Sequence, residues 1–198
     1  LDGQREGAGG RARGGLRQSR RWPWILPVTA TLEQHVHGQL DALCGDAGRV
    51  ALGYSGGGDS HALMVLAHSW ARQRDIELLV LTVDHGLRPE SAAEALQAIA
   101  SARALGLNGR VLDCVGSAPT SAIQETARSW RHEALARACN SAGVSRLLLA
   151  HTLDDQAETA LMRLQAGGRW QGLAGMGEDD VSPSWPAGRG VRLGRPLL

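Results

Sequence analysis

The alternation of strand-sized apolar runs with longer helical patterns constrains the fold of this chain more than any other feature of its sequence. Apolar runs of strand length recur four times, and each is followed by a segment whose apolar residues return at helical spacing. The predicted strands are residues 49–54, 77–83, 110–115 and 146–150, and the helices after them run to residue 70 and over 90–105, 121–142 and 154–166. Such alternation forms right-handed βαβ units. We therefore expect an α/β fold, a doubly wound parallel sheet with helices on both faces.

Further elements are expected at the two ends of this pattern. Apolar residues from Leu32 to Leu43 predict an additional helix that Thr31 would cap, and residues 191–193 predict a last strand. No regular element is expected between the helix over 154–166 and that strand. A buried helical face is expected for Leu161, Met162 and Leu164.

Length and composition fit one soluble globular domain, since the chain has 198 residues of which 43% are hydrophobic and 21% are charged. Its apolar runs are too short to span a membrane, which takes roughly 18 apolar residues. The three cysteines are odd in number and widely spaced, so they indicate neither a disulfide framework nor a zinc site. A reducing cytoplasm is therefore the expected location.

The first residues differ in charge from the rest of the chain. Residues 1–21 hold six arginines against two acids, a charge of +4, which leaves 15 arginines and 18 acids, or −3, of the total of +1. We expect residues 1–27 to be a flexible Gly- and Arg-rich leader and residues 28–198 to be one domain, incomplete at its C-terminus. The leader is either inert or an arm that contacts RNA phosphates. The rest of the chain has a negative net charge and is therefore not a basic nucleic-acid-binding surface.

A Gly-rich turn directly follows the first predicted strand and consists of Ser55, Gly56, Gly57, Gly58, Asp59 and Ser60. Its glycines let backbone N–H groups approach an anion, and the N-terminus of the next helix adds partial positive charge. The turn is not a Walker loop, since no Gly-Lys-Ser/Thr follows, and it lacks the dinucleotide pattern Gly-x-Gly-x-x-Gly. We predict a phosphate cradle; the alternative is a plain turn in which Asp59 and Ser60 cap the helix.

Polar residues also stand just past two other predicted strands. Ser55, Asp84 and His151 each follow a strand, and the carboxyl ends of parallel strands meet at one edge of a sheet, so one crevice is expected to collect all three loops. The helix after His151 opens with the acids Asp154, Asp155 and Glu158. Beside a triphosphate these carboxylates would hold Mg²⁺; the alternative is that they only favour the positive end of a helix dipole.

Basic side chains complete the predicted site. Arg128 and Arg131, three residues apart on one helix, would face the nucleotide and neutralise charge on leaving pyrophosphate. The alternative is that both are solvated on an exposed face. His85 and His151 are expected to bind base, ribose or phosphate rather than to transfer protons.

Several of these segments match known enzymes in order and spacing. The Ser55–Ser60 turn resembles the Ser-Gly-Gly-x-Asp-Ser signature of the PP-loop ATP pyrophosphatases, which cleave ATP to AMP and pyrophosphate. The other matching segments are Asp84–Ser91, Gln124–Arg131, Ala150–Thr159, Leu161–Leu164, Gly172–Met176 and Arg195–Leu198. Together, over about residues 47–198, they resemble the catalytic N-terminal domain of the tRNA(Ile)-lysidine synthetases.

The resemblance implies a two-step ligation. ATP adenylates the wobble cytidine of an isoleucine tRNA with a CAU anticodon and releases pyrophosphate, and the amine of free L-lysine then displaces AMP to give lysidine. ATP and Mg²⁺ are the expected cofactors. The expected catalytic residues are Asp59, Asp154, Asp155 and Arg131, and the expected metal ligands are Asp59, Asp155 and Glu158. Nucleotide binding is expected from the residues of the Gly-rich turn and from Asp84, His85, Arg128 and His151.

Two other functions stay open. A tRNA thiolase of the same superfamily would commonly carry paired cysteines, which this chain does not supply with Cys44, Cys114 and Cys139. The other function is that of a nucleotide-binding module without catalysis. It stays open because the chain departs from the pattern of the lysidine synthetases, with His132 where they usually have tyrosine and Ala166-Gly167 where they usually have Arg-Gly. Members of the family also continue past the segment that closes this chain. We therefore expect the 198-residue chain to bind MgATP but to modify tRNA poorly.

Overall fold

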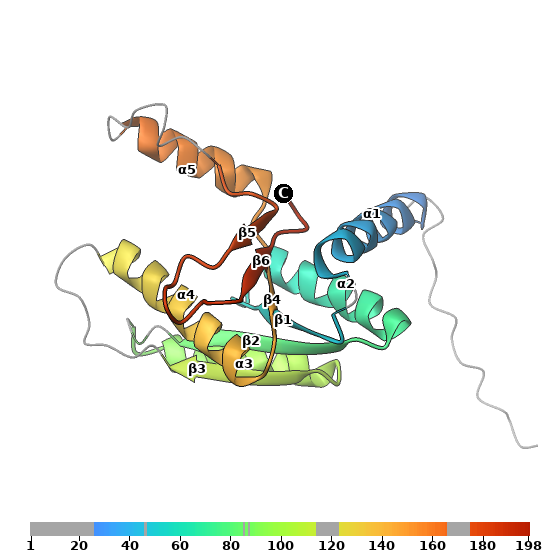
Figure 1. The fold of residues 1–198 in the computed structure, drawn as a ribbon, viewed down its shortest axis with the longest axis horizontal. Helices are drawn as coiled ribbons and strands as arrows, with labels where there is room; N and C mark the ends of the chain where they lie inside the picture. Colours follow the sequence, from blue (N-terminus) through green and yellow to red (C-terminus); the bar gives the residue numbers. More distant parts are fainter. Residues whose placement is uncertain (1–25, 46, 85, 87, 114–122, 166–174) are drawn as a thin grey trace, which may run out of the picture.

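The computed structural model describes residues 26–45, 47–84, 86, 88–113, 123–165 and 175–198. Its elements follow one another as α1 (Leu26–Cys44), β1 (Arg49–Gly53), α2 (Gly58–Arg74), β2 (Glu77–Asp84), α3 (Ser91–Ala104), β3 (Asn108–Asp113), α4 (Ile123–Ser141), β4 (Arg146–Leu149), α5 (Leu153–Gln165), β5 (Asp179–Val181) and β6 (Arg192–Gly194) (Figure 1). The predicted alternation of strands and helices is confirmed. None of the helices within these ranges has the length and apolar content to cross a membrane.

The strands form one sheet in the order β3-β2-β1-β4-β6-β5. The neighbours from β3 to β6 pair in parallel, and β5 pairs antiparallel with β6. From β1 the chain adds β2 and then β3 on one side, and it returns to add β4 on the other side. The direction of strand addition therefore reverses between β1 and β4. Open parallel sheets bind ligands beyond the carboxyl ends of their strands at such a switch point.

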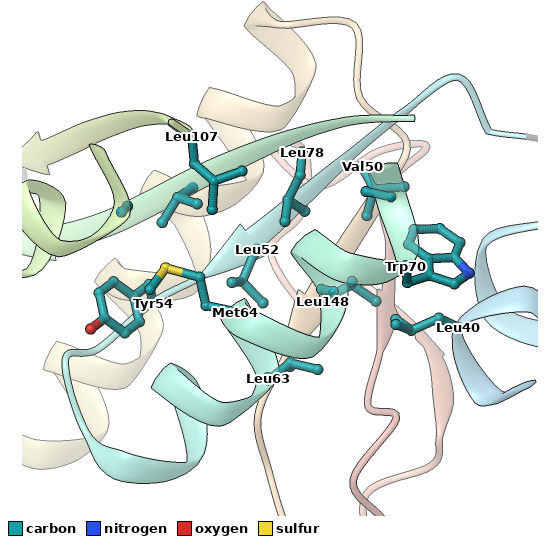
Figure 2. Packing of buried hydrophobic residues seen from close by; sticks show 14 of the residues in the cluster. Leu40, Val50, Leu52, Tyr54, Leu63, Met64, Trp70, Leu78, Leu107 and Leu148 are labelled. Atoms are coloured by element: carbon teal, nitrogen blue, oxygen red, sulfur yellow. The ribbon is translucent and has the colours of Figure 1, made fainter. Parts of the chain in front are cut away.

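Helices cover both faces of the sheet, as expected of a doubly wound fold. Side chains alternate between the faces along each strand, so Val50 and Leu52 of β1 pack with α1, α2 and α3. Ala51 of β1 and Leu147 of β4 pack on the opposite face with α4. Figure 2 shows the larger of these two clusters, with the fully buried ring of Trp70 against Leu40 of α1.

The structure corrects two expectations about helices. Helix α1 begins at Leu26, so Thr31 lies inside the helix and does not cap it. Pro27 stands in the first turn of α1, where the missing N–H removes no intrahelical hydrogen bond. Helix α5 has no buried residue, and the apolar side chains expected in its buried face are exposed instead. Their exposed fractions are 59% for Leu161, 61% for Met162 and 50% for Leu164.

Strand β5 is an element that the sequence pattern did not predict. Its three residues, Asp179–Val181, have neither the length nor the apolar character of a core strand. Charge holds it in place, because Asp179 accepts hydrogen bonds from Arg146 of β4 at 2.7 Å and Arg192 of β6 at 2.9 Å. The bond from Arg192, followed by the one from Arg146, keeps the pKa of Asp179 below its ordinary value. The edge of the sheet is thus closed by ion pairs rather than by apolar burial.

Candidate functional site

The Gly-rich turn joins the buried strand β1 to helix α2. Gly56 has a φ of +83°, a left-handed conformation that a side chain would strain, and Gly57 caps α2 in an extended conformation. The hydroxyl of Ser55 donates to that of Ser60 at 3.1 Å, and the Ser60 hydroxyl donates to the carbonyl of Gly57 at 2.9 Å. The turn is therefore closed by its own serines, while residues 55–59 are exposed. This is the geometry expected of an anion cradle at a helix N-terminus.

The loop after β2 is held by Asp84. Its carboxylate accepts hydrogen bonds from the backbone N–H of Gly86 at 2.9 Å and from the hydroxyl of Ser91 at 2.6 Å. Because Ser91 is the first residue of α3, these bonds tie the end of β2 to the start of that helix. His85, also predicted to bind the nucleotide, lies outside the described residues.

The loop after β4 carries His151 and the acids of α5. Thr152 and Asp155 form a capping box, in which the Asp155 carboxylate accepts from the Thr152 backbone N–H at 2.8 Å and Asp155 N–H donates to the Thr152 hydroxyl at 3.4 Å. Asp155 is half-buried, whereas Asp154 and Glu158 are exposed. Among the described residues, no group of three or more His, Cys, Asp or Glu side chains is gathered to hold a metal ion.

The switch-point cavity, of about 300 Å³, lies where these loops meet. Ser55 from the Gly-rich turn, Thr82 from β2, Arg131 and His132 from α4, and His151 from the loop after β4 all line it. Of the residues predicted for the site, Ser55, Arg131 and His151 line this cavity. Its lining does not include Asp59, Asp84, Asp154, Asp155 or Glu158. Arg128 lines a second cavity, which shares His132 with the first, and its guanidinium donates to the sulfur of Met176 at 3.9 Å.

Three buried polar atoms of residues that line the switch-point cavity have no hydrogen-bond partner among the described residues. They are Thr82 Oγ1, His132 Nδ1 and His151 Nδ1. Buried polar groups are nearly always hydrogen-bonded, so an unsatisfied set in one cavity points to a polar ligand. Sequence reasoning missed Thr82 and named His132 only as a departure. The signal for Thr82 was a hydroxyl inside the apolar run of β2.

Both histidines of the cavity are neutral near physiological pH. Burial, together with the charges of Arg131 and Arg128, lowers the pKa of His132 to about 4. Burial and the charge of Arg195 also lower the pKa of His151 to about 4, against the opposing effect of Asp155. Each imidazole therefore offers one donor and one acceptor to a ligand.

The described cysteines do not form a reactive centre. Cys44 and Cys139 are buried and unpaired in different clusters of the core. Burial raises the pKa of the Cys44 thiol to about 11 and that of the Cys139 thiol to about 12. A thiol must ionise to attack or to bind a metal. Cys114 lies outside the described residues.

Comparison with known proteins identifies relatives over most of the chain. A family model described as a PP-loop domain matches residues 30–198. The chain is 49% identical over 149 residues to the tRNA(Ile)-lysidine synthase of Hyphomonas neptunium, covering 75% of this chain and 40% of that protein. It is 46% identical over 177 residues to the tRNA(Ile)-lysidine synthase of a Bradyrhizobium species, covering 87% and 46%. The chain thus spans less than half the length of these curated relatives.

A solved structure shares the fold. The chain superposes with a TM-score of 0.70 on a U34-tRNA thiolase, NcsA, from Methanococcus maripaludis with its [4Fe-4S] cluster. Sequence identity is 22%, and the match covers 87% of this chain and 60% of that one. At this identity the likeness concerns the fold alone.

Proposed function

This chain belongs to the PP-loop domain family, and we propose that it is the nucleotide-binding part of an enzyme that joins L-lysine to the wobble cytidine of an isoleucine tRNA with a CAU anticodon. The tRNA would be adenylated by ATP with release of pyrophosphate, and lysine would displace AMP to give lysidine. Such an enzyme is a carbon–nitrogen ligase that works in the cytoplasm. Helix α1 begins at Leu26, two residues before the domain boundary expected from the sequence. Residues 26–198 would therefore be its PP-loop domain, and residues 1–25 a leader.

One observation carries this proposal: a cavity at the reversal point of the sheet is lined by Ser55 of the exposed Gly-rich turn and by residues whose buried polar atoms have no hydrogen-bond partner among the described residues. The turn supplies backbone N–H groups for phosphate, and Thr82, His132 and His151 supply hydrogen bonds for the less charged part of a nucleotide. The names of the relatives add the reaction, since those proteins are lysidine synthases.

For the adenylation step we assign charge stabilisation to the residues around the cradle. The backbone N–H groups of residues 55–60 and the N-terminus of α2 would hold the phosphates, and Arg131 would neutralise charge on pyrophosphate as it leaves. Asp84 would keep the loop after β2 in place, through its bonds to Gly86 and Ser91. A reaction of this kind needs positioning and electrostatics more than a protein nucleophile.

Mg²⁺ prefers oxygen ligands, and in nucleotide sites it is usually bound by one or two carboxylates together with phosphate oxygens. Asp59, Asp155 and Glu158 supply carboxylates, but the described part of the chain gathers no three such side chains at one place. We therefore propose that one or two of these three carboxylates bind Mg²⁺ together with phosphate oxygens. When bound, Mg²⁺ would neutralise phosphate charge. For the second step we propose that Asp154 or Asp155 accepts the proton of the lysine amine. The start of α5 places both carboxylates beside His151 in sequence.

The test is lysine incorporation into unmodified isoleucine tRNA with a CAU anticodon, with MgATP, while AMP and pyrophosphate are measured together. An isoleucine tRNA without a wobble cytidine is the matched control. We expect lysine-dependent formation of both products with the first tRNA only, at a low level from the 198-residue chain and at a higher level from a naturally longer version. MgATP binding without either product would instead indicate a nucleotide-binding module, and sulfur transfer to the tRNA would indicate a thiolase. Equal ligation by the 198-residue chain and by a naturally longer version would contradict the expectation that the shorter chain modifies tRNA poorly.

A further inference from the structure

A second cavity lies on the far side of His132 from the switch-point cavity. Its volume is about 350 Å³, and it is lined by α4, α5, residues 175–183 and the end of β6. We call it the Arg195 pocket. His132 lines both cavities, so a ligand in the Arg195 pocket would be adjacent to the proposed nucleotide. Arg195 belongs to the Arg-Pro-Leu-Leu segment that the sequence analysis singled out and the proposed function leaves without a role.

The guanidinium of Arg195 is fixed on one side and unsatisfied on the other. Its side chain is 5% exposed. One terminal nitrogen donates to the carbonyl of Gly177 at 2.5 Å and to the carboxylate of Asp180 at 2.6 Å. The Nε atom is buried and has no hydrogen-bond partner within the part of the chain that the structure describes. A buried charged donor without an acceptor is costly, so an acceptor brought by a ligand would be bound strongly.

Further positive charge surrounds this donor. Arg128 of α4 and Arg163 of α5 line the same pocket, and Asp180, which Arg195 already engages, is the one acidic residue among the described residues of its lining. The resulting positive potential extends past His132, because Arg128 and Arg195 both contribute to the lowered pKa of that imidazole. Met176, Val181 and Leu193 add an apolar wall. Such a lining suits an anionic group attached to a less polar body.

We propose that the Arg195 pocket binds an oxyanion, a phosphate or a carboxylate, at a site separate from the Gly-rich turn. The edge of an arginine that carries Nε is part of the planar fork that binds such groups through two parallel hydrogen bonds. Two sources share this chemistry, namely a backbone phosphate of the polynucleotide substrate and the carboxylate of free lysine. Only this choice of source rests on the proposed function; the anion site itself does not.

Binding of inorganic phosphate to the 198-residue chain, with MgATP present in saturating amount, tests the site. The readout is the NMR signal of arginine Nε–H groups. The variants are Arg195→Lys, which keeps the charge and loses the fork, and Arg163→Gln on the exposed end of α5. Arg103→Gln, an exposed arginine at the end of α3, is the control.

We expect Arg195→Lys to weaken phosphate binding on the order of tenfold, the effect of losing one charge-assisted hydrogen bond. Arg163→Gln should weaken it several-fold while MgATP affinity stays unchanged, and Arg103→Gln should alter neither. Because Arg163 is exposed, its variant keeps the test valid if Arg195→Lys fails to fold. The proposal is overturned if the chain does not bind phosphate, if both pocket variants bind it like the control, or if MgATP abolishes binding, which would place the anion in the Gly-rich turn.

Competition then identifies the source. Displacement of phosphate by L-lysine but not by lysine methyl ester would assign the pocket to the amino-acid carboxylate. Displacement by an anticodon stem-loop RNA, weakening as salt rises, would assign it to a backbone phosphate. If neither competes, the assignment to these substrates is wrong although the anion site stands. Failure of the ligation assay alone would contradict the proposed function and leave phosphate binding unaffected.

Discussion

Two neutral histidines lie close to arginine side chains in the switch-point cavity. His132 and His151 line one cavity, and burial and nearby guanidinium groups disfavour their protonation. An imidazole that stays neutral serves as a hydrogen-bonding group and adds no further repulsion between the arginines. The positive charge of the site is therefore carried by arginine, whose charge does not change over the physiological pH range.

This electrostatic arrangement predicts an acid-sensitive fold. In the unfolded chain His132 takes up a proton near its ordinary pKa of 6.5, but in the folded chain only near 4. Its contribution to stability is thus fully present above pH 6.5 and is lost as the pH falls toward 4. We expect His132→Tyr to reduce the loss of unfolding free energy between about pH 7.5 and about pH 5 by about 1–2 kcal/mol. Urea denaturation at both pH values measures it, and an unchanged loss would contradict the lowered pKa.

Asp59 allows a second test at a single side chain. It is exposed in the first turn of α2, next to the proposed phosphate cradle. We expect Asp59→Asn to weaken MgATP binding on the order of tenfold, because a Mg²⁺ ligand loses its charge, with no change in unfolding free energy. Asp75→Asn at the other end of α2 is the matched control, because asparagine tolerates the left-handed conformation found there. Calorimetric titration with MgATP decides the matter, and equal affinities would remove Asp59 from the site.

Sequence reasoning found the charged residues around the site more readily than the buried polar ones. The Gly-rich turn, Arg131 and His151 were predictable because each occupies a fixed place after a strand or on a helix. Thr82 and His132 matter because they are buried without partners, and a sequence does not show burial. The positions of Arg128 and Arg131 in different cavities were also hidden, since helical spacing gives a shared side of a helix but not the depth of each side chain.

Helix α5 differs from the other secondary-structure elements in what holds it. It begins with a capping box at Thr152 and Asp155, yet none of its residues is buried. Figure 1 shows α5 pointing away from the sheet. Periodicity correctly predicted the helix but not its packing, because a repeated apolar spacing does not identify a partner surface. Its stability therefore rests on the cap and on the hydrogen bonds between Gln156 and Met176 rather than on the core.

A pair of leucine substitutions tests this difference. Leu147 of β4 is 1% exposed and lies between β1 and β6, whereas Leu161 of α5 is 59% exposed. Leu147→Ala should lower the unfolding free energy by about 2–5 kcal/mol, through lost burial and the cavity left behind. Leu161→Ala should change it by less than about 0.5 kcal/mol. Urea unfolding of both variants is the measurement, and a comparable loss for Leu161→Ala would mean that its side chain is packed in solution.

Most strands and helices of the fold were predicted from the sequence, and few of their positions differ in the structure. Four strands and the helices after them were predicted because buried parallel strands leave continuous apolar runs. Strand β3 begins at Asn108, two residues before its predicted start, because Asn108 and Gly109 pair with β2 although neither residue favours a strand. Strand β5 could not be predicted, since ion pairs with β4 and β6 fix it and these depend on folding.

Nucleotide binding should stabilise the entire domain, because the proposed site joins β1, β2, α4 and the loop after β4. A ligand that binds only the folded state adds about 2.7 kcal/mol at a concentration one hundred times its Kd. We therefore expect MgATP to raise the midpoint of thermal unfolding progressively with concentration. Differential scanning fluorimetry with MgATP, and with Mg²⁺ alone as the control, measures this shift. A midpoint independent of MgATP would contradict the proposed site.

Strands β4 and β6 are neighbours in the sheet, although α5 and β5 stand between them in the sequence. Residues 150–191 carry the acids of α5 and much of the Arg195 pocket, and they connect two strands that pair with each other. The entropy cost of bringing together the two ends of such a connection grows only logarithmically with its length. Insertions, deletions or exchanges there would leave every parallel pairing intact. This part of the chain can therefore change in length or sequence while the parallel sheet that positions the Gly-rich turn stays the same.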